Sequence, residues 1–264
     1  MYERERIESA LCAYMAEDGS APLLVDSMAY SLLDGGKRIR PYLLLLVNAM
    51  LGGTESAAMP FACALEMVHC YSLIHDDLPA MDDDAMRRGK PSNHIRFGEA
   101  NAILAGDGLL TKAAVVLLSQ PGHDDAKRAI FDGAYAMVSG QSDDMNLHER
   151  SAEILERIHL NKTGALFRAA CKAGAYLSDP SKAEEMRAFG DTLGMLFQMT
   201  DDLLDEEKDL AEHKLTYVTF YGREQTLAFI NDAYTRANAI LAPYSGEAAE
   251  TLRELTQSLR SRTN

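Results

Sequence analysis

The sequence predicts an all-α protein, a bundle of roughly ten or more helices, because its apolar residues keep a helical period and turn signals separate them. Two long segments carry apolar side chains at three- and four-residue spacing, and neither alternates as a strand does. In residues 61–74 these are Phe61, Ala64, Leu65, Val68, Tyr71 and Ile74, and in residues 189–204 they are Phe189, Leu193, Leu196, Phe197, Thr200 and Leu204. Glycine and proline mark short connections, which favours a bundle, at residues 35–36, 52–53, 89–91, 121–122 and 178–180.

Composition indicates one globular domain over residues 1–264. The chain is 47% apolar and 25% charged, and it is long enough to bury a sizeable core. We find no apolar run that looks long enough to span a bilayer, and the N-terminus MYERERIESA is charged rather than signal-like. We therefore expect a cytoplasmic protein without a membrane span.

The net charge of −14 argues against nucleic acid and anionic membranes as partners. An anionic substrate must then be bound by a local basic cluster. The cysteines show no CxxC pair, and we expect small buried thiols rather than disulfides or zinc ligands, at Cys12, Cys63, Cys70 and Cys171.

Two aspartate clusters interrupt apolar segments, one in HDDLPAMDDD and one in FQMTDDLLD; their members are Asp76, Asp77, Asp82, Asp201, Asp202 and Asp205. An acidic run is commonly only a solvated helix end. Carboxylates within apolar runs are costly to bury unless a cation neutralises them. Two such clusters facing each other would form an all-oxygen site suited to magnesium, which bridges to substrate phosphates. The substrate is therefore expected to carry a diphosphate.

The two clusters differ in their local geometry. In a helix Asp201 and Asp205 share a face, with Gln198 one turn earlier on the same side. In a straight helix Asp76 and Asp82 would point about 240° apart. Because Pro79 lies between them, we expect a distorted helix end that returns Asp82 toward Asp76.

Basic residues gather beside the acidic clusters. GGKRIRP, residues 35–41, places three cations at the expected start of a helix, where they could hold a phosphate, although such a run is often mere surface. Two further basic sites are Arg87-Arg88-Gly89 and Lys162-Thr163-Gly164, and Lys214 follows the second acidic cluster. This arrangement fits two anionic groups, one bound through metal and one bound directly by Arg and Lys.

The ordered motifs GGKRIRP, HDDLPAMDDD with RRG, GQSDDM, NKTGAL and FQMTDDLLD resemble those of the trans-isoprenyl diphosphate synthases, the polyprenyl synthetase family, in its short-chain bacterial farnesyl diphosphate synthase branch. The resemblance runs from about residue 25 to about residue 220. It implies a class I terpenoid synthase fold, a homodimer, and about three magnesium ions per site.

The same resemblance assigns roles by position. It makes Asp76, Asp82 and Asp201 the main metal ligands, supported by Asp77, Asp202 and Asp205. The allylic substrate, dimethylallyl or geranyl diphosphate, would be held by Arg87, Lys162 and Lys214. Isopentenyl diphosphate would be held by Lys37, Arg40, His69 and Arg88, while Thr163 and Gln198 lie near the allylic carbon and Gln141 and Asp144 support the cavity.

The resemblance also suggests the product. Tyr71, five residues before Asp76, matches a bulky floor that stops elongation near farnesyl diphosphate, and Ser72 beside it leaves little extra depth. Tyr71 fits an ordinary core aromatic as well. His75 is expected to orient its neighbours rather than to act as a base.

One segment departs from the family pattern. Only EEKDLAEH, residues 206–213, separates Asp205 from Lys214, whereas the family carries a longer loop there. Such loops exclude water and complete a site, so the shortened segment leaves open a weakly active regulatory subunit that binds a partner synthase. The acidic motifs would also suit a geranyl or geranylgeranyl diphosphate synthase, a terpene cyclase or a metal-dependent phosphohydrolase. The two basic clusters disfavour the cyclase, which has no second diphosphate to hold.

Overall fold

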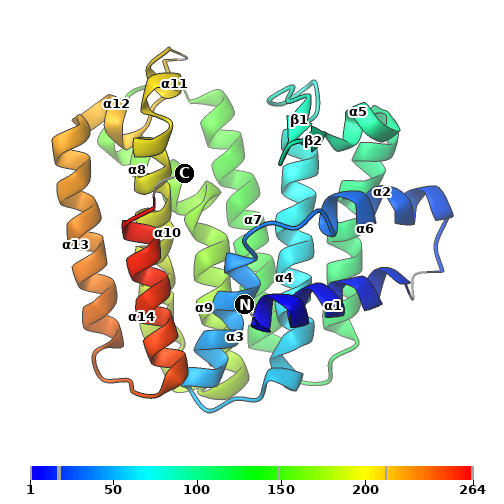
Figure 1. The fold of residues 1–264 in the computed structure, drawn as a ribbon, viewed down its shortest axis with the longest axis horizontal. Coiled ribbons are helices and arrows are strands. Elements are labelled where there is room, and N and C mark those ends of the chain that lie inside the picture. The colour runs from blue at the N-terminus through cyan, green and yellow to red at the C-terminus, as the bar shows by residue number, and fades with distance from the viewer. Residues whose placement is uncertain (1, 17–18, 148, 212, 263–264) are drawn as a thin grey trace. The chain divides into compact units, whose positions relative to one another are not determined.

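The computed structural model describes residues 2–16, 19–147, 149–211 and 213–262, and within them the chain forms fourteen α-helices (Figure 1). The all-α prediction is confirmed. The expected ten or more helices are present, and three of them, α5, α11 and α12, are only five or six residues long. The chain folds as two compact units, one comprising Met1–Leu45 with Glu55–His123 and the other Leu46–Thr54 with Asp124–Asn264. The single domain expected over residues 1–264 stays a prediction.

The first unit is built around the long helix α4, which packs along α6. Phe61, Leu65 and Val68 are fully buried in α4, as their helical spacing predicts. The elements of this unit are α1 (Tyr2–Ala16), α2 (Pro22–Leu32), the first part of α3 (Ile39–Met50), α4 (Glu55–Asp76), β1 (Met86–Arg87), β2 (Lys90–Pro91), α5 (Asn93–Phe97) and α6 (Glu99–Leu118). The two strands pair antiparallel across the Arg88-Gly89 turn.

The second unit is organised by α10, which packs against α9 and α13 while α7 packs against α9 (Figure 1). Phe189, Leu193 and Leu196 are fully buried on one face of α10. The elements are α7 (Asp124–Asn146), α8 (Ala152–Lys162), α9 (Gly164–Ser178), the 3-10 turn η1 (Pro180–Lys182), α10 (Ala183–Leu204), α11 (Glu206–Ala211), α12 (Tyr217–Tyr221), α13 (Arg223–Leu241) and α14 (Glu247–Arg260).

Two helices correct the expectation that the chain lacks a segment long and apolar enough for a bilayer. By length and composition both α4 and α6 pass that test. In α4 67% of the most apolar window is buried, as in the core helix of a globular unit, whereas in α6 the buried share is 39%. The apolar character of α4 is thus accounted for by the core of its own unit.

The thiols are as expected at three of four positions. All four cysteines lie in the described part of the chain and are free. Cys63, Cys70 and Cys171 are buried, and burial raises the pKa of the Cys63 and Cys70 thiols to about 12. The expectation fails for Cys12, which is exposed on α1.

Candidate active site

The first acidic motif lies where α4 ends. Helix α4 stops at Asp76, and the chain turns back through hydrogen bonds from Met81 N–H and Asp83 N–H to the Leu78 carbonyl. Asp82 N–H then donates to the Asp76 carbonyl at 2.9 Å. The expected return of Asp82 toward Asp76 is confirmed, with Pro79 in the turn rather than inside the helix.

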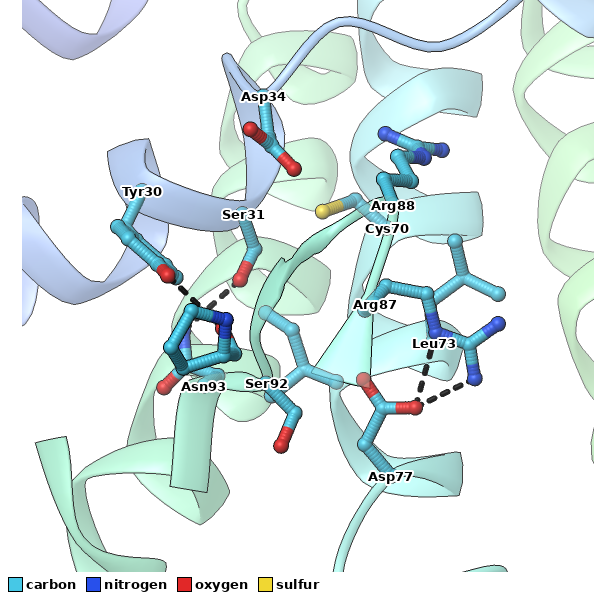
Figure 2. Close-up of a pocket in the computed structure, with 12 residues that line it drawn as sticks. Tyr30, Ser31, Asp34, Cys70, Leu73, Asp77, Arg87, Arg88, Ser92 and Asn93 are labelled. Carbon is cyan, nitrogen blue, oxygen red and sulfur yellow. Dashed lines mark hydrogen bonds and ion pairs between the residues drawn. The ribbon is translucent and has the colours of Figure 1, made fainter. Parts of the chain in front are cut away.

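Asp77, the second aspartate of this motif, is buried, with 3% of its surface exposed. Arg87 Nε on β1 donates to Asp77 Oδ1 at 2.9 Å, and Nη2 contacts the same oxygen (Figure 2). Burial raises the pKa of the Asp77 carboxyl, and the guanidinium opposes that shift. Asp77 therefore fixes the arginine rather than presenting two open oxygens.

Arg88 is held by the glycine pair that precedes α3. Its Nη1 donates to the Gly35 carbonyl at 2.9 Å, and its side chain is exposed. Gly36 has φ +106°, and a Cβ there would lie 2.9 Å from the guanidinium carbon of Arg88. The pair thus supplies both an acceptor and the space for the arginine, while Lys37 beside it is exposed. Figure 2 shows Arg88 near Asp34 and Cys70, further along the pocket wall than Arg87.

Arg40 and His69 are brought together in the first unit. Arg40 Nη1 and His69 Nε2 lie 3.2 Å apart. Burial lowers the pKa of His69 well below its ordinary value, and the charges of Arg40 and Arg88 lower it further. The imidazole is therefore neutral and accepts a hydrogen bond from the guanidinium.

Arg38, the middle cation of GGKRIRP, has a structural role. Its side chain is 1% exposed, its Nη1 pairs with buried Glu66 at 2.6 Å, and its Nε pairs with Glu8 at 2.9 Å. Nη2 donates to the Leu32 carbonyl. Because its donors are turned into the first unit, Arg38 ties α1, α2 and α4 together and is not available to a phosphate.

Tyr71 is 6% exposed and meets His75 edge-on, with 5.8 Å between the ring centroids. Burial raises the pKa of its phenol to about 12. His75 Nε2 lies 3.1 Å from the Ile103 carbonyl of α6, where Gly106 leaves room because a Cβ would lie 2.1 Å from that nitrogen. Ser72 Oγ donates to the His69 carbonyl. His75 thus docks α4 on α6, and its orienting role stays a prediction.

The second acidic motif lies in the last turn of α10 in the second unit. Asp202 is 2% exposed, and its two oxygens accept hydrogen bonds at 2.8 Å from Gln198 Nε2 and from Tyr217 N–H at the start of α12. Burial raises the pKa of Asp202 to about 7, against the effect of these two donors. Asp202 therefore anchors α12 to α10 while Asp201 is half-buried and Asp205 is exposed.

Thr163 and Gln198 meet because two helices approach closely through glycine. A Cβ on Gly194 would lie 2.6 Å from the Gly164 Cα, so only glycine permits this contact between α9 and α10. Thr163 Oγ1 then donates to Gln198 Oε1 at 2.6 Å, one turn beyond Gly194. The hydroxyl, the amide and Asp202 form one hydrogen-bonded chain.

The cations of the second unit are also paired. Lys162 Nζ, at the end of α8, lies 2.5 Å from Asp144 Oδ2 near the end of α7. Arg262, which follows α14, pairs with Asp201 at 2.5 Å between Nη1 and Oδ1. Gln141 lies on α7 one turn before Asp144.

The short segment after Asp205 is ordered around α11. Arg150 Nη1 donates to the His213 carbonyl at 3.1 Å, and Arg223 pairs with Glu206 at 2.5 Å. Lys214 N–H donates to the carbonyl of buried Asp209, and the Lys214 residue is exposed. Residue 212 of EEKDLAEH lies outside the described residues.

The donor chemistry of both motifs suits a hard cation. Both place carboxylates at the C-terminal end of a helix, where the backbone dipole is negative and a cation is favoured: Asp76 is the last residue of α4, and Asp205 caps α10. Within the described residues, three or more His, Cys, Asp or Glu side chains do not gather into one preformed metal cluster. Asp76 and Asp82 in one unit, and Asp201 and Asp205 in the other, are the carboxylates whose position suits such an ion.

Comparison with known proteins settles the family. Residues 21–239 match the sequence profile of the Polyprenyl synthetase family. The chain belongs to this family. It is therefore a prenyltransferase, and the resemblance seen in its ordered motifs is confirmed.

Relatives of this polyprenyl synthetase are named for two different products, farnesyl diphosphate and geranylgeranyl diphosphate. The farnesyl diphosphate synthase of Micrococcus luteus is 40% identical over 259 residues, covering 90% of this chain and 86% of the relative. The geranylgeranyl diphosphate synthase of Cyanophora paradoxa is 42% identical over 252 residues, covering 86% and 84%. The crystal structure of a geranyltransferase from Legionella pneumophila superposes with a TM-score of 0.87 at 36% identity, covering 98% of this chain and 94% of that one. The polyprenyl synthetase fold is thus shared along the chain.

Sequence reasoning missed two features around the second acidic motif of this polyprenyl synthetase. Arg262 lies 61 residues from Asp201 and belongs to no motif. The contact of Gly164 with Gly194 was also not foreseen, although the glycine of NKTGAL and the glycine one turn before Gln198 were usable signals.

Proposed function

We propose that the protein condenses isopentenyl diphosphate with dimethylallyl or geranyl diphosphate to form farnesyl diphosphate. The observation that supports this most is that each unit carries an acidic helix end with cationic side chains in the same unit: Asp76 with Arg87 and Arg88, and Asp201 with Lys162. A reaction between two diphosphates needs both kinds of group.

Magnesium would be held by Asp76, Asp82 and Asp201 as main ligands, with Asp205 in support. The family resemblance suggests about three ions, which would supply positive charge to stabilise the leaving diphosphate. Asp77 and Asp202 would each support the acidic motif of their own unit, because Arg87 takes one oxygen of Asp77 while Gln198 and Tyr217 N–H take both oxygens of Asp202.

The chain's own groups bind, orient and exclude water. Arg87, Lys162 and Lys214 would bind the allylic diphosphate, and the C–O bond breaks with its electron pair leaving on diphosphate. Lys37, Arg40, Arg88 and neutral His69 would bind isopentenyl diphosphate so that its double bond attacks the allylic carbon. The dipoles of Thr163 and Gln198 would soften the allylic cation. The released diphosphate is the base that takes the final proton.

Farnesyl rather than geranylgeranyl product is proposed because Tyr71 is a buried, bulky side chain little more than one turn before Asp76. Its edge contact with His75 holds the ring in place. The geranylgeranyl diphosphate synthase of Cyanophora paradoxa, at 42% identity, supports the longer product as the second candidate. Tyr71→Ala is expected to lengthen the product, and Tyr71→Phe, which keeps the ring, is its matched control.

The test uses purified protein, magnesium, labelled isopentenyl diphosphate and each allylic starter in turn, with chromatography of the dephosphorylated products. Magnesium-dependent farnesyl product is expected. Geranylgeranyl product from the unmodified protein would keep the reaction and reject the Tyr71 floor. No product from folded protein would favour the regulatory subunit and direct attention to the short segment around α11.

We also propose a cytoplasmic homodimer that meets its second copy through α6. Four large apolar side chains of α6 are exposed by 45% to 76%: Ile103, Leu104, Val115 and Leu118. A second copy would remove this stripe from water. A monomer by sedimentation for Leu104→Glu, against a dimer for the unmodified protein, is the expected result, and an unmodified protein that sediments as a monomer would reject the proposal.

A further inference from the structure

Arg262, near the C-terminus, contacts the second acidic motif, although none of the family motifs includes this residue. Arg262 Nη1 is 2.5 Å from Asp201 Oδ1, and the two side chains are only 22% and 27% exposed. The same guanidinium lies over the Phe197 ring, 4.8 Å from its centroid. One face of the guanidinium is thus covered by an aromatic ring and one edge meets a carboxylate. These two contacts together fix the position of the Arg262 side chain.

Helix α14 carries Arg262 to this place. It packs against α10 and buries Leu252 and Leu259, and in Figure 1 the C-terminal end lies toward the end of α10 that leads to α11. Ser261 closes the helix, with its N–H and hydroxyl both donating to the Gln257 carbonyl. Arg262 is therefore the first residue beyond a well-formed helix end, which limits where its side chain can reach.

The pair is incomplete, which makes it displaceable. The Arg262 Nε is buried and donates to no acceptor among the described residues. A buried N–H without a partner costs free energy, and the contact with Asp201 is made through a single nitrogen rather than as a fork. A divalent ion offers Asp201 twice the charge at shorter distance.

We propose that Arg262 is the resident counter-ion of Asp201: its guanidinium neutralises this carboxylate until a divalent cation takes its place. This inference rests on the proposed metal site at Asp201. Arg262 is thus a positioning residue that keeps the carboxylate oriented and sets the metal concentration needed for binding at the second motif. Metal binding in turn releases the C-terminal end of α14.

The first experiment measures Mn²⁺ binding by the loss of its free-ion electron spin resonance signal, without substrate. Arg262→Gln is expected to bind Mn²⁺ about two- to fivefold more tightly, the range for a partly exposed ion pair. Arg260→Gln is the matched control: it removes the same charge two residues earlier, where the guanidinium lies 4.5 Å from the Tyr234 ring instead. The Mn²⁺ affinity of Arg260→Gln should equal that of the unmodified protein.

A double-mutant cycle locates the effect. In an Asp201→Asn background Arg262→Gln should no longer change Mn²⁺ affinity, because the pair is already gone. Equal affinity in Arg262→Gln and the unmodified protein, or an equal gain in Arg260→Gln, would overturn the proposal while leaving the metal site intact. Mn²⁺ binding to none of these proteins would instead overturn the proposed metal site, and the displacement with it.

Hydrogen exchange supplies a readout independent of affinity. Amides of residues 257–262 should exchange faster in the unmodified protein when Mg²⁺ is added, and equally fast in Asp201→Asn without Mg²⁺. If neither Mg²⁺ nor Asp201→Asn altered the exchange rates of these amides, Asp201 would not hold the end of α14, and the proposal would fail.

Discussion

The two acidic motifs share an Asp-Asp pair at the end of a helix, yet they use it differently. In both, the second aspartate is buried at 2% to 3% exposure and the first is left half-buried. Asp77 pairs with Arg87, ten residues further along the chain, whereas Asp202 accepts hydrogen bonds from an amide and a backbone N–H. In each pair the second aspartate is thus held by partners within its own unit, while the first stays more accessible to solvent.

The counter-ions explain the difference in electrostatics. Burial raises the pKa of both second aspartates, but the guanidinium opposes the shift at Asp77 while only uncharged donors oppose it at Asp202, whose pKa reaches about 7. The first motif therefore contains its own cation. The second takes its cation, Arg262, from the far end of the chain.

The largest effect is expected from the first aspartate of each pair. Asp76→Ala or Asp201→Ala should lower kcat about 10³-fold, because a metal ion that stabilises the leaving group is worth several kcal/mol. Steady-state assays measure the loss, and circular dichroism checks that the fold persists. Near-normal turnover in either variant would remove that motif from the metal site.

The next largest effect is a pH dependence of stability caused by His159, a buried histidine of the second unit. His159 is 6% exposed, and its ring centroid lies 5.4 Å from that of Tyr217. Burial lowers its pKa from 6.5 to about 4, with Lys162 acting in the same direction and Asp144 against it. Below pH 6.5 the unfolded chain binds a proton that the folded chain does not bind until about pH 4. The contribution of His159 to the free energy of unfolding should therefore fall by up to about 3 kcal/mol as the pH drops through this window, while Asp202, whose pKa is raised to about 7, contributes in the opposite direction.

Urea unfolding at about pH 7.5, 5.5 and 4.5, values that begin above this window and cover most of it, measures the slope. His159→Phe, which keeps the ring and loses the titrating nitrogens, should lose less stability over the same range. Parallel curves for the two proteins would show that His159 is not the group responsible.

Much of this architecture was predictable because it is local in sequence. The helical period located α4 and α10, and Pro79 gave the turn that returns Asp82 to Asp76. Arg38 was grouped with phosphate-binding cations, since its burial depends on Glu8 and Glu66, which no motif links to it. Arg262 was missed for the same reason. Long-range ion pairs leave no periodic signal, so the sequence showed the motifs but not their distant partners.

A comparison of Asp77→Asn with Asp202→Asn tests the two supporting roles. Asp77→Asn deprives Arg87, which is 35% exposed, of its buried anion, leaving the exposed Asp84 at 3.5 Å, and should cost about 1–2 kcal/mol of unfolding free energy. Asp202→Asn keeps one acceptor oxygen and should cost about 1 kcal/mol, the loss of one hydrogen bond. Urea unfolding at neutral pH measures both. The reverse order would mean that the link from α10 to α12 matters more than the buried ion pair.

The smallest effect is expected from the glycine contacts, which differ between the two units. In the first unit Gly36 makes room for the end of a flexible side chain, Arg88, whereas in the second Gly194 makes room for the backbone of Gly164. Gly36→Ala should therefore displace Arg88 and raise KM for isopentenyl diphosphate about tenfold, the equivalent of one lost charge-assisted hydrogen bond. Gly52→Ala imposes the same kind of positive-φ strain, at φ +86° with no atom within 4 Å, and should lower stability without changing KM. If both variants changed KM alike, backbone strain rather than the position of Arg88 would be the cause. The pair Gly35-Gly36 would then contribute to the stability of the fold and not to substrate binding.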